Sequence, residues 1–183
     1  GALESHEYAA LLESYVGTVL IYQDTYHEAC YRAAHISGPK SDYYARLNAA
    51  DVAFQAGVPD VGGGLMLGLG PWQYDLLGIV QHQAHLLRAY DTGCRTLSLH
   101  RMRCAPGSNM QTPYPVSDAD YLRCVAIARL AVPYAGIILT TKEPAGLWRD
   151  GCSAGASQLL TGSVANPYGN WIDNPEHKVP FPI

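Results

Sequence analysis

The polar residues of this sequence that could bind a ligand follow directly after short apolar runs. Residues at four such places together supply hydroxyl, carboxylate and cationic groups: Gln23, Asp24, Thr25, Tyr26 and His27; Arg101 and Arg103; Thr140, Thr141, Lys142 and Glu143; Thr161, Gly162 and Ser163. Guanidinium and ammonium groups bind carboxylates, and hydroxyls complete the hydrogen bonding of such an anion. The set therefore favours a small anionic or zwitterionic ligand. A structural interpretation fits equally well, in which Arg101, Arg103 and Lys142 pair with Asp24 or Glu143.

Other kinds of reactive site have less support in the sequence. No GxSxG segment accompanies His27, His35 or His100, so serine nucleophile chemistry is only weakly indicated. His82 and His85 lie in one expected helix without a third ligand nearby, and we expect them to be solvated or packed. The cysteines lack CxxC and CxxxCxxC spacing, which predicts small reduced thiols at Cys30, Cys94, Cys104, Cys124 and Cys152.

The elements that must position these residues alternate along the chain as strands and helices, the pattern of parallel β/α units. We expect strands at residues 16–23, 60–68, 95–103, 136–143 and 157–163, and helices at 7–15, 41–56, 72–90, from 117 onward, and 145–154. In such units the carboxyl ends of the strands carry the chemistry. Five strands do not complete an eight-fold barrel, and no GxGxxG or GxxxxGK[ST] segment marks a nucleotide-binding sheet. A partial barrel and an open sheet both remain possible at this point.

Composition limits the classes of protein and partner. With 183 residues, 48% of them hydrophobic, the chain can form one domain over residues 1–183, ending in an irregular segment at 164–183. Sixteen acidic and twelve basic residues are interspersed, which argues against nucleic acid as a partner. No apolar stretch is long enough to span a bilayer, so we expect a cytoplasmic protein without a membrane partner. Unpaired strand edges would favour association with other chains.

Five segments, in order over nearly the whole chain, carry a family resemblance. YQDTYHEACYRAAHISGPKSDYYARL resembles the YQETYH and GxKxDYxxRL stretch of the radical S-adenosylmethionine aromatic amino acid lyases. DVGGGLMLGL is similar to their glycine-rich barrel strand, SLHRMRCA to their SxPRxRP segment, ILTTKEP to ILSTREx, and QLLTGSVANPYG to SAGS…GGY. The hydrogenase-maturation branch of tyrosine lyases is the closer one, and the thiamine-biosynthesis 2-iminoacetate synthases are next.

The resemblance implies a fold, a reaction and two cofactors. The fold would be an α/β, partial (β/α) TIM-type barrel of about five parallel strands, with its N-terminal strands missing. The full-length parent would cleave the Cα–Cβ bond of tyrosine to dehydroglycine and p-cresol, using S-adenosylmethionine and a 4Fe-4S cluster. The CxxxCxxC cluster motif is absent from this sequence. The chain by itself is therefore expected to be inactive.

Position by position, the resemblance also implies ligand contacts. Asp24, with Thr25 and Tyr26, would lie near the ribose and methionyl groups of the cofactor, and Arg46 near its carboxylate. The family's two arginines correspond to Arg101 and Arg103, which we group with the cofactor-binding residues. Thr140, Lys142 and Ser163 would face the substrate carboxylate. No catalytic residue and no metal ligand is assigned.

Several residues depart from the family pattern. Asp24 replaces Glu, and Lys142 replaces Arg, which removes a bidentate partner for a carboxylate. His100 and Cys104 replace two prolines. Arg95 stands near an iron-ligating histidine of the maturase branch, and arginine cannot ligate iron. The alternative functions are a non-catalytic barrel fragment and a binding module for S-adenosylmethionine or an amino acid.

Overall fold

A computed structural model describes residues 2–102, 112–140 and 142–160 of the chain. Five parallel strands form one sheet in the order β1(Thr18–Asp24), β2(Asp60–Leu67), β3(Thr96–Arg101), β4(Gly136–Thr140) and β5(Gln158–Leu160). Each strand pairs with the next in sequence, whereas a doubly wound sheet reverses its order at a switch point. The structure therefore selects the partial barrel over the open doubly wound sheet.

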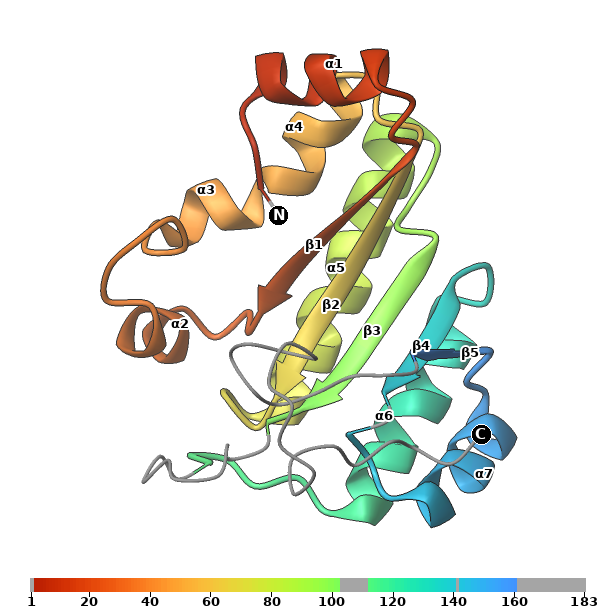
Figure 1. Cartoon of the computed structure of the whole chain (residues 1–183). Helices are drawn as coiled ribbons and strands as arrows, with labels where there is room; N and C mark the ends of the chain where they lie inside the picture. Colours follow the sequence, from red (N-terminus) through yellow and green to blue (C-terminus); the bar gives the residue numbers. More distant parts are fainter. Residues whose placement is uncertain (1, 103–111, 141, 161–183) are drawn as a thin grey trace, which may run out of the picture.

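The helices lie mainly on one face and one end of this sheet (Figure 1). Their bounds are α1(Ser5–Glu13), α2(Glu28–Ala34), α3(Tyr43–Leu47), α4(Ala49–Gln55), α5(Trp72–Tyr90), α6(Asp118–Ala131) and α7(Ala145–Ala154). Helix α1 lies at the N-terminal ends of the strands, and α5 runs along the back of β1, β2 and β3. None of the helices in the described part of the chain is long and apolar enough to cross a membrane.

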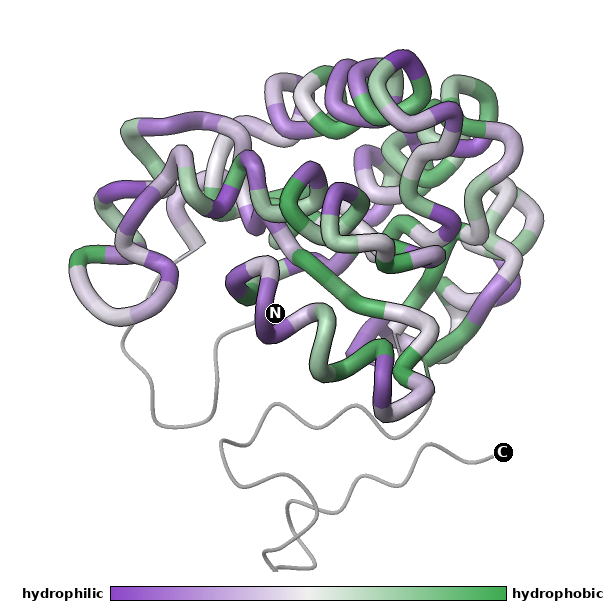
Figure 2. Tube along the Cα trace, turned by 90° about the horizontal axis from the view of Figure 1, so that it is seen from above, coloured by the Kyte–Doolittle hydropathy of each residue, from purple (hydrophilic) through white to green (hydrophobic). Residues whose placement is uncertain are grey.

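The hydrophobic core fills the space between the sheet and its helix layer. Alternate strand residues such as Leu65, Leu97 and Leu99 are fully buried there. Figure 2, which looks along the strands, shows hydrophobic stretches of strand inside and alternating hydrophilic and hydrophobic residues along the helices. This alternation is expected for an amphipathic helix that covers one face of a sheet.

The glycine run of β2 lets side chains of β1 lie across the sheet. A Cβ added at Gly64 would lie 1.8 Å from Cδ1 of Tyr22, and one added at Gly62 would lie 2.3 Å from Cδ2 of Leu20. The atoms that approach these two glycines belong to side chains of β1. Gly64 thus allows the Tyr22 ring to cover part of the face opposite α5.

Two sequence expectations about helices are wrong. The single helix expected at 41–56 is divided at Asn48 into α3 and α4, in keeping with the low helix propensity of asparagine. The Asp42 side chain caps the start of α3, where it accepts a hydrogen bond from the backbone N–H of Ala45. Helix α2 was not expected, since seven residues are too few to show a clear period; it is held by ring contacts of Tyr31 with His35 and Tyr43.

The buried faces of the long helices also differ from their sequence patterns. The apolar residues that recur at helical spacing in α5 include Leu87, which is exposed, whereas the buried face includes the polar residues Asp75 and Gln83. On α6 Leu130 follows the same apolar spacing but is 82% exposed, and the buried face contains Tyr121 instead. Polar residues can be buried here because their partners lie on other elements. Cys94 accordingly donates its backbone N–H to Gln83 Oε1 at 2.7 Å.

Candidate functional site

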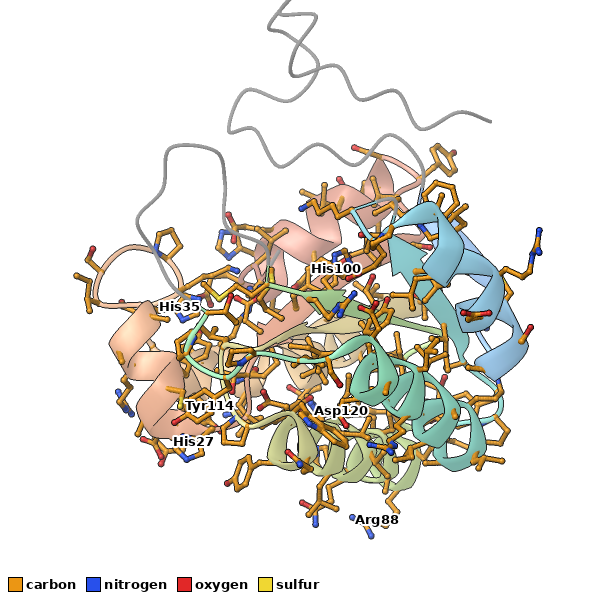
Figure 3. All side chains as sticks on the ribbon, turned by 90° about the horizontal axis from the view of Figure 1, so that it is seen from below. His27, His35, Arg88, His100, Tyr114 and Asp120 are labelled. Carbon is orange, nitrogen blue, oxygen red and sulfur yellow. The ribbon has the colours of Figure 1, made fainter. Side chains whose placement is uncertain are left out.

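The candidate site is the face of the sheet opposite α5, at the carboxyl ends of the strands. Figure 3, which looks at these ends, shows His100 and His35 on that face, while Arg88 lies on the outer side of the helix layer. Tyr22 and His100 meet there, with ring centroids 5.6 Å apart and planes at 73°. Side chains near the carboxyl ends of β1 and β3 therefore meet on this face.

His100 forms the centre of this face as a neutral side chain. Its Nε2 lies 2.7 Å from Ser98 Oγ, and Ser98 has no other side-chain partner in the described part of the chain. The serine hydroxyl and Nε2 form a hydrogen bond in which either group can be the donor, depending on the tautomer of the ring. Burial and, to a lesser extent, the nearby Lys142 cation lower the pKa of His100 to about 4, while Glu143 and Asp24 oppose the shift. The imidazole is thus uncharged at neutral pH and lies within electrostatic reach of charges from β1 and β4.

Asp24 forms one side of the site at the end of β1. Its φ angle is 67°, in the left-handed region, and its Oδ2 accepts from Lys40 Nζ at 2.5 Å. His35 Nε2 lies 3.2 Å from the same oxygen, and His35 Nδ1 lies 3.0 Å from the carbonyl of Tyr31. Both ring nitrogens of His35 therefore lie within hydrogen-bond distance of an oxygen atom. Sequence reasoning missed His35 as a site residue, and Lys40 appeared only as a letter of the GxKxDY motif.

Lys142 and Thr140 form the opposite side. Thr140 is buried, and its Oγ1 accepts the backbone N–H of Lys142 at 3.1 Å. The Lys142 side chain is exposed and has no ion-pair partner among residues 2–102, 112–140 and 142–160. An ammonium group beside a neutral imidazole is able to bind a carboxylate. The expected site residues Arg103 and Ser163 lie outside the described residues.

Arg46 lies at the edge of β1 that has no described strand beside it. Its Nε donates to the carbonyl of Tyr22 at 2.6 Å, and the residue is buried. Its two terminal nitrogens have no hydrogen-bond partner in the part of the chain that the structure describes. Such a guanidinium retains the paired donors that recognise a carboxylate.

Thr25 and Tyr26 follow Asp24 but point to the helix side. The Thr25 hydroxyl donates to Asp75 Oδ1 at 2.7 Å, and the backbone N–H of Tyr26 donates to the same oxygen at 2.8 Å. The Tyr26 hydroxyl lies 2.7 Å from Nδ1 of His82. Burial raises the pKa of Asp75. The structure therefore shows these two residues holding the turn that presents Asp24, with their side chains away from the open face.

Arg101 is buried in an ion-pair network on the helix side. Its Nε lies 3.1 and 3.0 Å from the two carboxylate oxygens of Glu143, and its Nη1 lies 2.7 Å from Asp118 Oδ1. Its guanidinium carbon also lies 4.9 Å from the ring centroid of Tyr121. The pairing with Glu143 that the sequence allowed is present. In this arrangement the guanidinium of Arg101 binds protein groups, and it affects a ligand on the open face by holding Glu143 and the end of β3 in position.

The donor set fits one of the two expected cofactors. The unpaired guanidinium nitrogens of Arg46 suit a carboxylate, and the Asp24 carboxylate suits hydroxyl or ammonium donors, which together match S-adenosylmethionine. The sequence contains no set of cysteines with the CxxxCxxC spacing that binds an iron-sulfur cluster. Burial raises the pKa of Cys94 to about 11 and that of Cys124 to about 12, so both thiols stay protonated.

Known proteins are similar to most of this chain. Residues 98–171 match the model of the Biotin and Thiamin Synthesis associated domain. The chain is 30% identical over 142 residues to 2-iminoacetate synthase of Escherichia coli K12, covering 77% of this chain and 37% of that protein. For the Salmonella typhimurium 2-iminoacetate synthase the identity is 26% over 175 residues, covering 95% and 46%. The chain thus spans less than half the length of these relatives.

Solved structures show the same relationship. A HydG maturase of the [FeFe]-hydrogenase superposes with a TM-score of 0.85 at 38% identity, covering 89% of this chain and 36% of that one. HydG from Carboxydothermus hydrogenoformans gives 0.87 at 34% identity, covering 95% and 40%. Methylornithine synthase, at 18% identity and a TM-score of 0.68 over 87% of this chain and 44% of that one, shares the fold. By sequence and by structure, the chain is similar to part of the 2-iminoacetate synthases and of the HydG maturases, in agreement with the resemblance that its motifs carry.

Proposed function

We propose that this chain supplies part of the active-site barrel of a radical lyase that cleaves the Cα–Cβ bond of an aromatic amino acid, with tyrosine as the first candidate. The observation that carries the proposal is the set of polar groups around His100. Asp24 from β1 and Lys142 after β4 both act on this one half-buried imidazole, on the face that the helices leave open. The negative charge of Asp24 and the positive charge of Lys142, on two sides of the neutral His100 ring, match the two charges of a zwitterionic amino acid.

Arg46 and Asp24 would hold S-adenosylmethionine in this arrangement. The paired nitrogens of Arg46 would bind its carboxylate, and Asp24 would accept hydrogen bonds from its ribose or ammonium group. When bound to the cluster in the intact protein, S-adenosylmethionine supplies the radical chemistry of the family. Thr25 and Tyr26 would act by fixing the turn at Asp24, and Arg101 by fixing the end of β3. Arg103 stays a proposed cofactor contact on the resemblance alone.

Lys142 would bind the substrate carboxylate, together with Thr140 and, by resemblance, Ser163. A lysine offers one compact charge where an arginine would offer a planar pair of donors. His100 would supply the second donor from Nδ1 in the neutral tautomer whose Nε2 accepts from Ser98. The surrounding strands would exclude water from the reacting bond and fix its orientation.

The cluster ligands and the remaining strands would come from parts of the intact protein outside this segment. The outer edges of β1 and β5 have no partner strand in the described residues and would pair with those strands. Iron and sulfide analysis of the isolated 183-residue chain tests this assignment. Stoichiometric cluster binding by this chain would overturn it.

The activity itself is tested on the intact protein that carries this segment. After anaerobic reconstitution with iron, sulfide, S-adenosylmethionine and tyrosine, we expect both 5′-deoxyadenosine and p-cresol. Lys142→Ala should lower kcat/KM for tyrosine by about tenfold or more, the loss expected for one charged hydrogen bond. Arg88→Ala, which removes an exposed cation from the outer side of α5, should leave it unchanged. Absence of both products would refute the proposed reaction.

A further inference from the structure

A second cavity lies on the helix side of the sheet, away from the open face that holds His100. It has a volume of about 450 Å³ and opens between the α3–α4 segment and α5. Tyr26, Tyr43, Tyr74, His82, His85 and Asp51 contribute most of its aromatic and polar lining. This volume falls within the range of small-molecule sites. The proposed lyase reaction makes no use of this cavity.

Two of the cavity's tyrosines are held in fixed positions. A Cβ added at Gly78 would lie 2.5 Å from Cγ of Tyr26, so only glycine at this turn of α5 lets the Tyr26 ring lie against the helix. The Tyr26 hydroxyl then reaches Nδ1 of His82 at 2.7 Å. The hydroxyl of Tyr43 donates to the carbonyl of Tyr26 at 2.8 Å. The aromatic walls are therefore set by specific contacts between distant parts of the chain.

The cavity contains one carboxylate and no lysine or arginine among its lining residues. Oδ1 of Asp51 lies 2.7 Å from Nε2 of His85 and accepts the hydroxyl of Tyr90 at 2.9 Å. Its Oδ2 has no hydrogen-bond partner in the described part of the chain. Burial lowers the pKa of His82, which keeps that ring neutral at pH 7. No group of three His, Cys, Asp or Glu in the described residues could hold a metal ion, so the lining favours an organic ligand.

We propose that this cavity binds a small organic cation, an ammonium group carrying an aromatic or aliphatic body. The ammonium group would bind Oδ2 of Asp51 and lie against the tyrosine rings, which attract cations through their π faces. Leu47 and Leu77, which also line the cavity, would contact the apolar body. A carboxylate or phosphate would meet Asp51 without any compensating cation, so anions are excluded by charge.

The cavity is connected to the open face through one turn of the chain. Tyr26 lines it, and the backbone N–H of Tyr26 is held by Asp75 together with the hydroxyl of Thr25. Asp24, on the other face, is two residues away in the sequence. A ligand in this cavity would therefore contact the back of the turn that presents Asp24.

Isothermal titration calorimetry on the intact protein at pH 8 tests the proposal with benzylamine, benzyl alcohol and benzoate, which are similar in shape and differ in charge. We expect benzylamine, the cation, to bind with a Kd of about 1 mM or tighter. Neutral benzyl alcohol should bind at least about fivefold more weakly, because it lacks the charge that pairs with Asp51. Benzoate should show no binding. Equal binding of benzylamine and benzyl alcohol, or no saturable binding of benzylamine, would overturn the proposal.

Three variants locate the bound cation. Asp51→Asn keeps the oxygen that accepts from His85 and Tyr90, removes the charge, and should weaken benzylamine about tenfold. Asp150→Asn, the same change at an exposed position on α7, should bind benzylamine as the unaltered protein does. Leu77→Lys places a cation at a residue that is 56% exposed and should abolish benzylamine binding without disturbing the core. Equal affinities for the Asp51 and Asp150 variants would refute the assignment, whatever the lyase assay shows.

Discussion

Replacing Glu143 by Gln tests whether Arg101 serves the fold, as its contacts indicate. The side chains of Arg101 and Glu143 are 6% and 2% exposed, and the substitution removes the negative charge while it keeps the shape. Breaking a buried ion pair by neutralising one partner typically costs about 3–5 kcal/mol. Asp118 stays 2.7 Å from Arg101 Nη1, but it is 66% exposed and offsets only part of that cost. We therefore expect Glu143→Gln to lower the free energy of unfolding by about 2–3 kcal/mol.

Urea unfolding followed by tryptophan fluorescence measures this loss close to the altered residue. Trp148 donates its Nε1–H to the backbone carbonyl of Glu143 at 2.9 Å, so its emission reports on this region. Glu13→Gln, at an exposed position on α1, is the matched control and should change stability by less than about 0.5 kcal/mol. The double variant Arg101→Met with Glu143→Leu should be more stable than Glu143→Gln, because no unpaired charge is left buried.

The result that would refute this reasoning is a stable Glu143→Gln protein. A loss of less than about 1 kcal/mol would mean that the network contributes no more than an exposed pair does. If Arg101→Met then kept its stability but lost affinity for S-adenosylmethionine, Arg101 would be a direct cofactor contact.

Three further predictions concern the open face and the turn beside it. The pKa of His100 is lowered to about 4 from 6.5, so the neutral ring contributes to the free energy of unfolding above pH 6.5, and this contribution is lost as the pH falls toward 4. Urea unfolding from pH 8 to 4.5 should therefore show a loss of about 3 kcal/mol that the His100→Phe variant lacks. Gly64→Ala should destabilise the protein by about 1–3 kcal/mol in the same assay, because its methyl group meets the Tyr22 ring, while Gly17→Ala, with no atom within 4 Å, should show no clash-related loss. Burial raises the pKa of Asp75, so unaltered protein should gain stability relative to Asp75→Asn as the pH falls; a constant difference between the two would contradict the buried carboxylate.

Features carried by neighbouring residues could be predicted from the sequence alone. Runs of β-branched and apolar residues located the five strands, and the cap at Ser117 located the start of α6, where its Oγ accepts from the backbone of Asp120 at 3.1 Å. The order of the motifs predicted the resemblance to the tyrosine lyases before any contact was known. Such features depend on local periodicity and capping, which need no distant partner.

The tertiary structure decided which face each polar side chain takes. Asp24, Thr25 and Tyr26 are consecutive, but only Asp24 joins the open face, because its left-handed backbone and the carboxylate of Asp75 turn the next two residues toward the helices. Arg101 and His100 are likewise neighbours on β3 that take opposite faces of the sheet. A shift of one residue along a strand reverses its side chains, so only pairing and packing with distant elements can fix them. Asp75 lies 50 residues from Thr25 and Glu143 lies 42 residues from Arg101, separations across which sequence patterns carry no information about contact.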